Sequence, residues 1–215
     1  MRFGRVFLLA SLASAICIGQ PDREKDVYAI YSLLLTNPQT SHGPDNNAKY
    51  LILDTTVAVV PAQPCLDAKG ERRERITEIL KDFETRKNAR RKLQRDLKLS
   101  KPYELLTESE AKQFRNRNAN PEWSIRFAGV TDLFSFSDVY FDKAGTLALT
   151  YISSWCGSLC ALFQWKLLEK KADGSWKESP GVGCVAVASG LVKRMEANQP
   201  GDDALLAGFV APASE

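Results

Sequence analysis

The stretch from residue 133 to residue 176 constrains the fold most, because it alternates apolar and polar side chains between short turns. Residues 146–155 and residues 161–170 both place large apolar side chains at alternate positions, which predicts two β-strands. The tetrapeptide at 142–145 (DKAG) and the pair at 173–174 (DG) are typical of tight hairpin turns, in which glycine supplies a positive φ. Strands joined by turns this short predict an antiparallel β-meander of about four to five strands.

Residues 134–141 also read as a strand, but the apolar pattern changes phase inside it. Phe134 and Phe136 share one parity, whereas Val139 and Phe141 share the other. Such a change indicates a β-bulge, or a strand that is buried on both faces.

The chain has five cysteines, and two of them flank a predicted hairpin loop at Cys156-Gly-Ser-Leu-Cys160. On a continuous strand these sulfurs would lie about 13 Å apart, whereas a three-residue loop brings the two Cα atoms into the roughly 4–7 Å range of a disulfide. Cys65 would then pair with Cys184. Cys184 lies in one more possible strand, at 182–188. Pairing of Cys65 with Cys156 or Cys160 stays open.

Redox and metal chemistry are both disfavoured for these cysteines. Thiol oxidoreductases place two residues between their cysteines at the start of a helix, whereas this pair encloses three residues between strands. A zinc site would need further ligands, and the chain has a single histidine, His42. We therefore expect a structural disulfide, with no metal and no cofactor.

The first half of the chain is mainly helical by pattern. Residues 22–35 and 70–93 carry apolar side chains at helical spacing, with a strand expected between them at 50–60. Thr107 and Glu110 form a capping-box pattern that predicts a short helix at 108–116. Residues 118–130 are expected to be irregular.

The C-terminal part of the long helical candidate is strongly cationic. It suggests contact with an envelope component or an anionic polymer. The alternative is a solvated helix face neutralised by the preceding acidic side chains, and this interpretation is favoured. The cations in question are Arg86, Lys87, Arg90 and Arg91.

The N-terminus predicts export. Arg2 and Arg5 precede about ten apolar residues, a pattern typical of a cleavable signal peptide at residues 1–19 and too short for a membrane span. Cleavage after Gly19 leaves an even set of four cysteines, which suits an oxidising compartment. Cleavage after Ala15 is the alternative, as is lipidation of Cys17.

Without the signal peptide the chain is nearly neutral, because its 29 basic side chains lose Arg2 and Arg5 and face 26 acidic ones. A general nucleic-acid binder would carry a clear basic excess, so specific nucleic-acid binding is not expected. Residues 20–190 are long enough for one domain with a proper core. Residues 191–215 are rich in alanine, glycine and proline and predict a loose tail. No segment after the signal peptide predicts a membrane span.

Three residues are candidate ligand or catalytic groups. His42 and Asp138 could serve a hydrolase, although His42 lies in a polar loop and Asp138 has an oddly apolar neighbourhood. Trp155, beside the disulfide loop, could present an aromatic surface to a ligand. No nucleophile elbow, phosphate-binding glycine loop or zinc-protease helix occurs, so no catalytic residue is assigned.

Several local sequences together resemble an uncharacterised family of bacterial exported proteins. The resemblance spans most of the mature chain and implies a bacterial envelope or secreted protein with a helical first half and a β-meander. It transfers no site residue. It is carried by Tyr28 and Tyr31, Asp54-Thr55-Thr56, residues 136–142 (FSDVYFD), 147–151 (LALTY), 156–160 (CGSLC), 167–171 (LLEKK) and 174–176 (GSW).

These patterns predict an α+β fold in which N-terminal and central helices pack on an antiparallel β-meander. As a function, we expect a non-catalytic binding or interaction domain that is exported to the periplasm or secreted. A small periplasmic or secreted hydrolase is one alternative. A cell-envelope structural protein is another, and it would present a broad exposed apolar patch.

Overall fold

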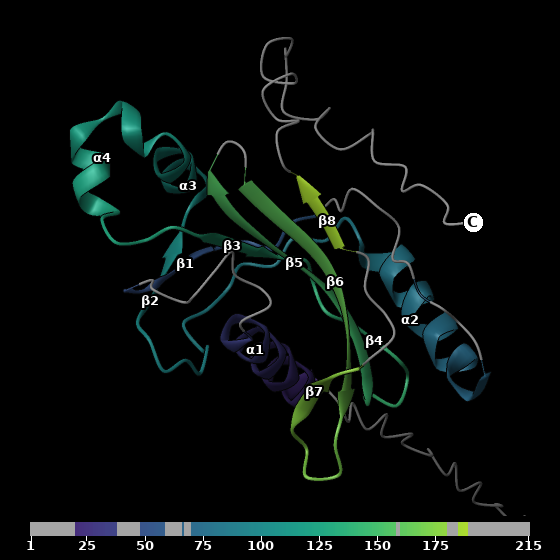
Figure 1. Ribbon diagram of the computed structural model, residues 1–215. Helices are drawn as coiled ribbons and strands as arrows, with labels where there is room; N and C mark the ends of the chain where they lie inside the picture. Colours follow the sequence, from purple (N-terminus) through teal and green to yellow (C-terminus); the bar gives the residue numbers. More distant parts are fainter. Residues whose placement is uncertain are drawn as a thin grey trace, which may run out of the picture.

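The computed structural model describes residues 20–37, 48–58, 66, 70–157, 160–179 and 185–188 (Figure 1). Helices and one mixed β-sheet make up the fold, so the predicted α+β class is confirmed. The helices are α1 (Gln20–Thr36), α2 (Arg73–Arg86), α3 (Glu108–Arg115) and α4 (Pro121–Arg126). The strands are β1 (Tyr50–Leu53), β2 (Tyr103–Leu106), β3 (Leu133–Phe136), β4 (Tyr140–Phe141), β5 (Leu147–Gly157), β6 (Cys160–Lys170), β7 (Trp176–Glu178) and β8 (Val185–Ala188).

The sheet is mixed rather than purely antiparallel, and its eight described strands exceed the predicted four to five. Its order is β2-β1-β3-β5-β6-β7, with β4 beside β5 and β8 beside β6. The predicted meander of β5, β6 and β7 is antiparallel, but β1 runs parallel to both β2 and β3. The sequence did not predict the strand β2. This strand has only four residues, directly after Pro102, and is too short to show the alternation of a β-strand.

The phase change at residues 134–141 is a β-bulge. The predicted strand is split into β3 and β4. Phe136 of β3 pairs with Ile152, and Tyr140 of β4 pairs with Leu149, so four steps along the chain face three steps along β5. The extra residue turns Val139 and Phe141 toward the same face of the sheet as Phe134 and Phe136.

The long helical candidate is shorter than predicted, and one helix was missed. The helix α2 ends at Arg86 instead of Leu93. Leu93 packs with Leu97 under α1 as part of an irregular segment, residues 87–102, which we call the connector. The missed helix, α4, begins at Pro121, and the Asn120 side chain caps it by accepting from the Glu122 backbone amide. Proline is favoured at the first helical position because its missing N–H would have no partner there.

The two faces of the sheet carry different helices. Ala148 and Ile152 of β5 pack in the cluster beneath α1, whereas Leu147, Leu149 and Tyr151 pack in the cluster beneath α2. Successive side chains of a strand point to opposite faces, so α1 and α2 lie on opposite sides of the sheet. The helices α3 and α4 share the face of α2, packing on Leu51, Leu53 and Leu133.

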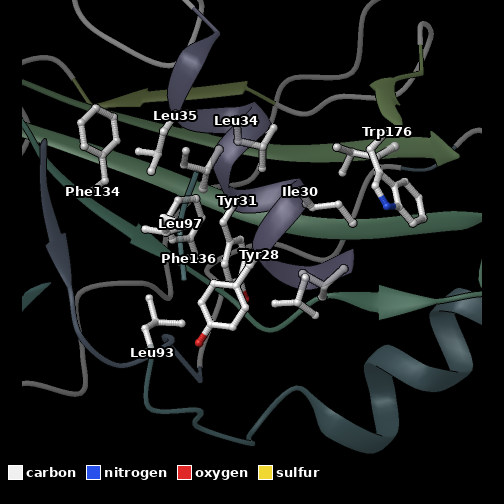
Figure 2. Packing of buried hydrophobic residues seen from close by; sticks show 14 of the residues in the cluster. Tyr28, Ile30, Tyr31, Leu34, Leu35, Leu93, Leu97, Phe134, Phe136 and Trp176 are labelled. Carbon is white, nitrogen blue, oxygen red and sulfur yellow. The ribbon is translucent and has the colours of Figure 1, made fainter. Parts of the chain in front are cut away.

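The cluster under α1 is made of aromatic and branched aliphatic side chains (Figure 2). Tyr31 is fully buried at its centre and stacks on Phe136, with ring centroids 4.3 Å apart. Its hydroxyl donates a 2.7 Å hydrogen bond to the Ser137 carbonyl in the bulge. The helix α1 is thus attached to the sheet at the point where the strand changes phase.

Several predictions lie outside the described residues. They are the signal peptide and its cleavage sites, Cys17, His42, Cys65, Cys184 and the tail at 191–215. Among the described helices, none is both long and apolar enough to cross a membrane. Ile125 of α4 is the one large apolar side chain that is exposed among the residues described, so this part of the chain shows no broad apolar patch.

Candidate functional site: a groove between α2 and the β4–β5 hairpin

The first half of α2 is tied to the β4–β5 turn by charged side chains. Arg75 Nε donates to a carboxylate oxygen of Asp142 at 2.8 Å, and one turn later Glu78 accepts from both the backbone amide and the side-chain amine of Lys143. Residues three or four apart on a helix lie on the same side, so both pairs face the turn. They fix the position of the helix along the hairpin.

Asp142 is a buried turn residue. Its side chain is fully covered and accepts from the backbone amides of Thr146 and Leu147 as well as from Arg75. Burial alone would raise the pKa of Asp142, but the Leu147 amide, Arg75 and the Thr146 amide outweigh it and hold that pKa below its ordinary value. Asp142 therefore stays ionised and stabilises the hairpin.

The second half of α2 is tied to the β-bulge. Asp82 accepts from the Phe141 backbone amide at 3.0 Å, while Arg86 binds Asp82 and donates to the Val139 carbonyl at 2.7 Å. Burial acts to raise the pKa of Asp82, but Arg86 and the Phe141 amide lower it overall. These bonds continue the row that Arg75 and Glu78 begin.

Asp138 is the counter-ion of two arginines. One carboxylate oxygen lies 2.5 Å from Arg86 Nη1, and the other lies 3.2 Å from Arg91 Nη2 and also accepts from the Val139 amide. The side chain is only 5% exposed. Asp138 has apolar sequence neighbours because it lies in the buried bulge. Both of its carboxylate oxygens accept hydrogen bonds from donors of the protein.

Tyr140 completes the contacts of the bulge. The guanidinium of Arg86 lies 5.3 Å from the Tyr140 ring centroid, a cation–π distance. Burial, reinforced by the negative charge of Asp138, raises the pKa of Tyr140 to about 12. Tyr140 therefore remains a neutral phenol throughout the physiological range.

An open cavity of about 940 Å³ runs beside this row of contacts. We call it the α2–hairpin groove. The helix α2 forms one wall, the end of β4 with the following turn forms the other, and Arg23 of α1 stands at its margin. Its lining residues are Arg23, Gly70, Arg73, Glu74, Thr77, Glu78, Lys81, Asp82, Thr85, Phe141, Asp142 and Lys143.

The charges of the groove are unevenly satisfied. Three of its four carboxylates are already paired, since Glu78 binds Lys143, Asp82 binds Arg86 and Asp142 binds Arg75. By contrast, three exposed cations make no salt bridge within the described part of the chain; they are Arg23, Arg73 and Lys81. Positive charge is therefore left over along the groove.

The groove also offers hydrogen-bond acceptors. The hydroxyls of Thr77 and Thr85 donate to the backbone carbonyls of Arg73 and Lys81, each at 2.8 Å. With their protons used inside the helix, the two oxygens keep lone pairs that can accept a hydrogen bond, and both residues line the groove. Glu74 adds a carboxylate that is exposed and has no salt bridge among the residues described. A ligand would thus meet both donors and acceptors.

Trp155 lies in a different place, on the α3 side of the sheet. It is half-buried, with its ring centroid 5.7 Å from that of Phe114 and 5.8 Å from the guanidinium carbon of Arg117. It lines a second cavity of about 130 Å³ with Phe163 and Arg115. This volume is well below the roughly 300–1,000 Å³ typical of ligand pockets.

Cys156 and Cys160 lie at the end of the same hairpin. Their Cα atoms are 5.2 Å apart and the residues are joined by a disulfide, as the hairpin interpretation requires. The Gly157 residue pairs with Cys160 after a register irregularity in the β5–β6 ladder. The bridge thus closes the loop of a hairpin between β-strands.

The four candidate cations of the connector region do not form one surface. Arg86 and Arg91 point to Asp138, and Lys87 binds Glu84 at 2.6 Å. Arg90 is exposed and makes no salt bridge among the described residues. Three of the four cationic groups are therefore paired within the protein, two of them with Asp138.

Comparison with known proteins identifies no relative, since no family model, curated protein or solved structure matches the chain. Within the described residues, no group of three or more histidine, cysteine or acidic side chains is placed to hold a metal ion.

The groove was missed by sequence reasoning, although part of its signal was readable. Arg73, Thr77, Lys81 and Thr85 recur every four residues and so lie on one side of α2. The sequence pattern predicts a solvated face whose acidic residues pair with cations of the same helix, and Asp82 does pair with Arg86 in this way. Glu78 instead binds Lys143 of the hairpin. The partner of Arg75 is instead 67 residues away, at Asp142.

Proposed function

We propose that this protein is an exported, non-catalytic binding domain whose ligand occupies the α2–hairpin groove. The observation that carries the proposal is the groove itself, which is large enough for a ligand and is lined by three cations without salt bridges among the described residues. The leader-like N-terminus and the Cys156–Cys160 bridge support the export part of the proposal.

The construction of the groove walls favours binding. The hairpin wall is fixed to α2 by Arg75, Glu78 and Asp82, and α2 itself packs on the sheet through Ile76, Ile79 and Phe83. A preformed site of this kind loses little conformational entropy when a ligand enters. The same contacts leave the outer row of α2 available to a partner.

Asp138 weighs against the hydrolase alternative. A general base must have an oxygen within hydrogen-bond reach of the group that it deprotonates. Both oxygens of Asp138 are bound by Arg86, Arg91 and the Val139 amide. The carboxylate is therefore better suited to stabilising the bulge than to chemistry.

A blocking variant tests the proposed site. Thr77 lies in the middle of the groove, so Thr77→Trp places an indole where the ligand would lie. Purified mature protein is screened by thermal shift and calorimetry against acidic and neutral peptides, polyuronates, polyphosphate and cell-wall fragments. We expect at least one class to bind the wild type and to lose binding in Thr77→Trp, while Ser109→Trp on the exposed start of α3 binds normally.

Two results would overturn this proposal. One is a ligand that binds both tryptophan variants with wild-type affinity, which would place the site elsewhere. The other is turnover of a chromogenic ester or glycoside that disappears in Asp138→Asn while the unfolding temperature is unchanged, which would support the hydrolase.

A further inference from the structure

We infer that the α2–hairpin groove binds an extended acidic peptide segment. This inference rests on the proposed function and adds the chemical class of the ligand. It starts from the excess of positive charge: Arg23, Arg73 and Lys81 are exposed, whereas the carboxylates of Glu78, Asp82 and Asp142 are each neutralised by a cation of the protein. An anionic ligand is the one that complements such a surface.

The spacing of the cations suits an extended chain. Arg73 and Lys81 are eight residues apart on α2, which corresponds to about 12 Å at the helical rise of 1.5 Å per residue. In an extended peptide, side chains four residues apart are separated by about 13 Å and point to the same side. Two acidic side chains at positions one and five of a peptide therefore match the two cations.

The third cation is held in place. The guanidinium of Arg23 lies 5.2 Å from the ring centroid of Phe141, and its charge helps to lower the pKa of Asp82 in the groove. Arg23 thus projects from α1 over the opposite wall from Arg73. A ligand anion near Phe141 would meet a cation whose orientation is already set.

The acceptors of the groove distinguish a peptide from other polyanions. Polyphosphate has no hydrogen-bond donor in its ionised form, so it can donate to none of the acceptor oxygens of Thr77, Thr85 and Glu74. A peptide supplies backbone N–H donors together with its carboxylates. An acidic polysaccharide supplies hydroxyl donors, but sugars are commonly bound against an open aromatic face, and the one aromatic ring in the groove lining, Phe141, is buried and covered by Arg23.

The test uses a fluorescently labelled pentapeptide of sequence Glu-Ala-Glu-Ala-Glu, blocked at its C-terminus, and its glutamine counterpart. Fluorescence anisotropy is measured with the full mature chain at low and moderate salt. We expect the acidic peptide to bind and the glutamine peptide to bind at least tenfold more weakly. The double variant Arg73→Gln/Lys81→Gln should lose about tenfold in affinity, in line with two ion pairs of moderate strength.

A charge-matched control removes two exposed cations from the connector, as Arg95→Gln/Lys98→Gln. This variant has the same net charge as the groove variant, so general electrostatic attraction predicts the same loss for both. The inference requires the connector variant to keep wild-type affinity. Circular dichroism and unfolding temperature confirm that both variants are folded.

The possible results separate the inference from the proposed function. Equal losses in the two double variants, or no binding of the acidic peptide, would overturn the acidic-peptide inference. A glutamine peptide that binds more tightly than the acidic peptide would also overturn the inference. If Thr77→Trp abolishes that binding, the groove would still be a binding site. Tighter binding of polyphosphate or of a polyuronate in the same groove would assign the site to that polymer instead.

Discussion

The two helices that cover the centre of the sheet are attached in different ways. The helix α1 packs mainly through a wide apolar face, with Tyr31 and Leu34 fully buried, and adds polar contacts from the Tyr31 hydroxyl and from Asp26. The helix α2 combines a narrow apolar stripe with a row of charged side chains directed at the hairpin. Apolar contact stabilises a helix without strongly fixing its position along the sheet. Ion pairs and hydrogen bonds fix that position, and on the α2 side they also shape the edge of the groove.

The largest effect should come from breaking the α1 side. Phe136→Ala removes a fully buried ring that stacks on Tyr31 at the β-bulge. We expect a loss of about 4 kcal/mol in the free energy of unfolding, measured by urea denaturation, because a large cavity is left in the core. Phe136→Leu, which preserves most of the volume, should cost less than about 1.5 kcal/mol.

A somewhat smaller effect is expected at the bulge on the α2 side. Asp138→Ala leaves Arg86 and Arg91 partly buried without their common counter-ion, and should cost about 3 kcal/mol. Adding Arg91→Met to Asp138→Ala should recover part of that loss, because Arg91 has no other salt bridge among the described residues, whereas Arg86 still binds Asp82. A double-mutant cycle measured by urea unfolding gives the coupling. Strict additivity of the two substitutions would show that the pair is not coupled.

The next prediction concerns pH. The pKa of Asp142 is lower in the folded state than its ordinary value of 3.8, so its contribution to stability is full above that value and is lost as pH falls through the folded pKa. The unfolding temperature should therefore fall between about pH 5 and pH 2, and Asp142→Asn should make this fall shallower. An acid slope that is the same in Asp142→Asn as in the wild type would contradict this assignment.

The smallest effect is expected at the outer end of the charged row. Lys143 is 86% exposed and pairs with Glu78, so Lys143→Gln should leave the free energy of unfolding almost unchanged in urea denaturation, because exposed ion pairs contribute little. The contrast with Asp138→Ala tests whether the row becomes stronger as it becomes more buried. A loss as large as that caused by Asp138→Ala would contradict that gradient.

Local sequence signals predicted the local structure well. Thr107 and Glu110 form the capping box that begins α3, and the parity change between Phe136 and Val139 marks the bulge. Each of these signals is contained in a few consecutive residues. The disulfide between Cys156 and Cys160 belongs to the same class, because the two cysteines are only four residues apart and lie on the two strands of one hairpin.

The parallel strands and the groove depend on contacts between distant residues, which no local pattern encodes. The strand β2 pairs with β1 at a separation of about fifty residues, and nothing in the sequence Tyr103-Glu-Leu-Leu specifies a parallel partner. Arg75 likewise gives no sign of its bond to Asp142. The proposals on export and on membership of the exported-protein family remain predictions from the sequence.

The central claim, that the α2–hairpin groove is the binding site, is tested most directly by nuclear magnetic resonance. Uniformly ¹⁵N-labelled mature protein is titrated with the Glu-Ala-Glu-Ala-Glu peptide, and the backbone and indole signals are followed. We predict shifts grouped on Thr77, Lys81 and Lys143, with the Trp155 indole signal unchanged. Shifts grouped instead on the connector or on Trp155 would contradict the account.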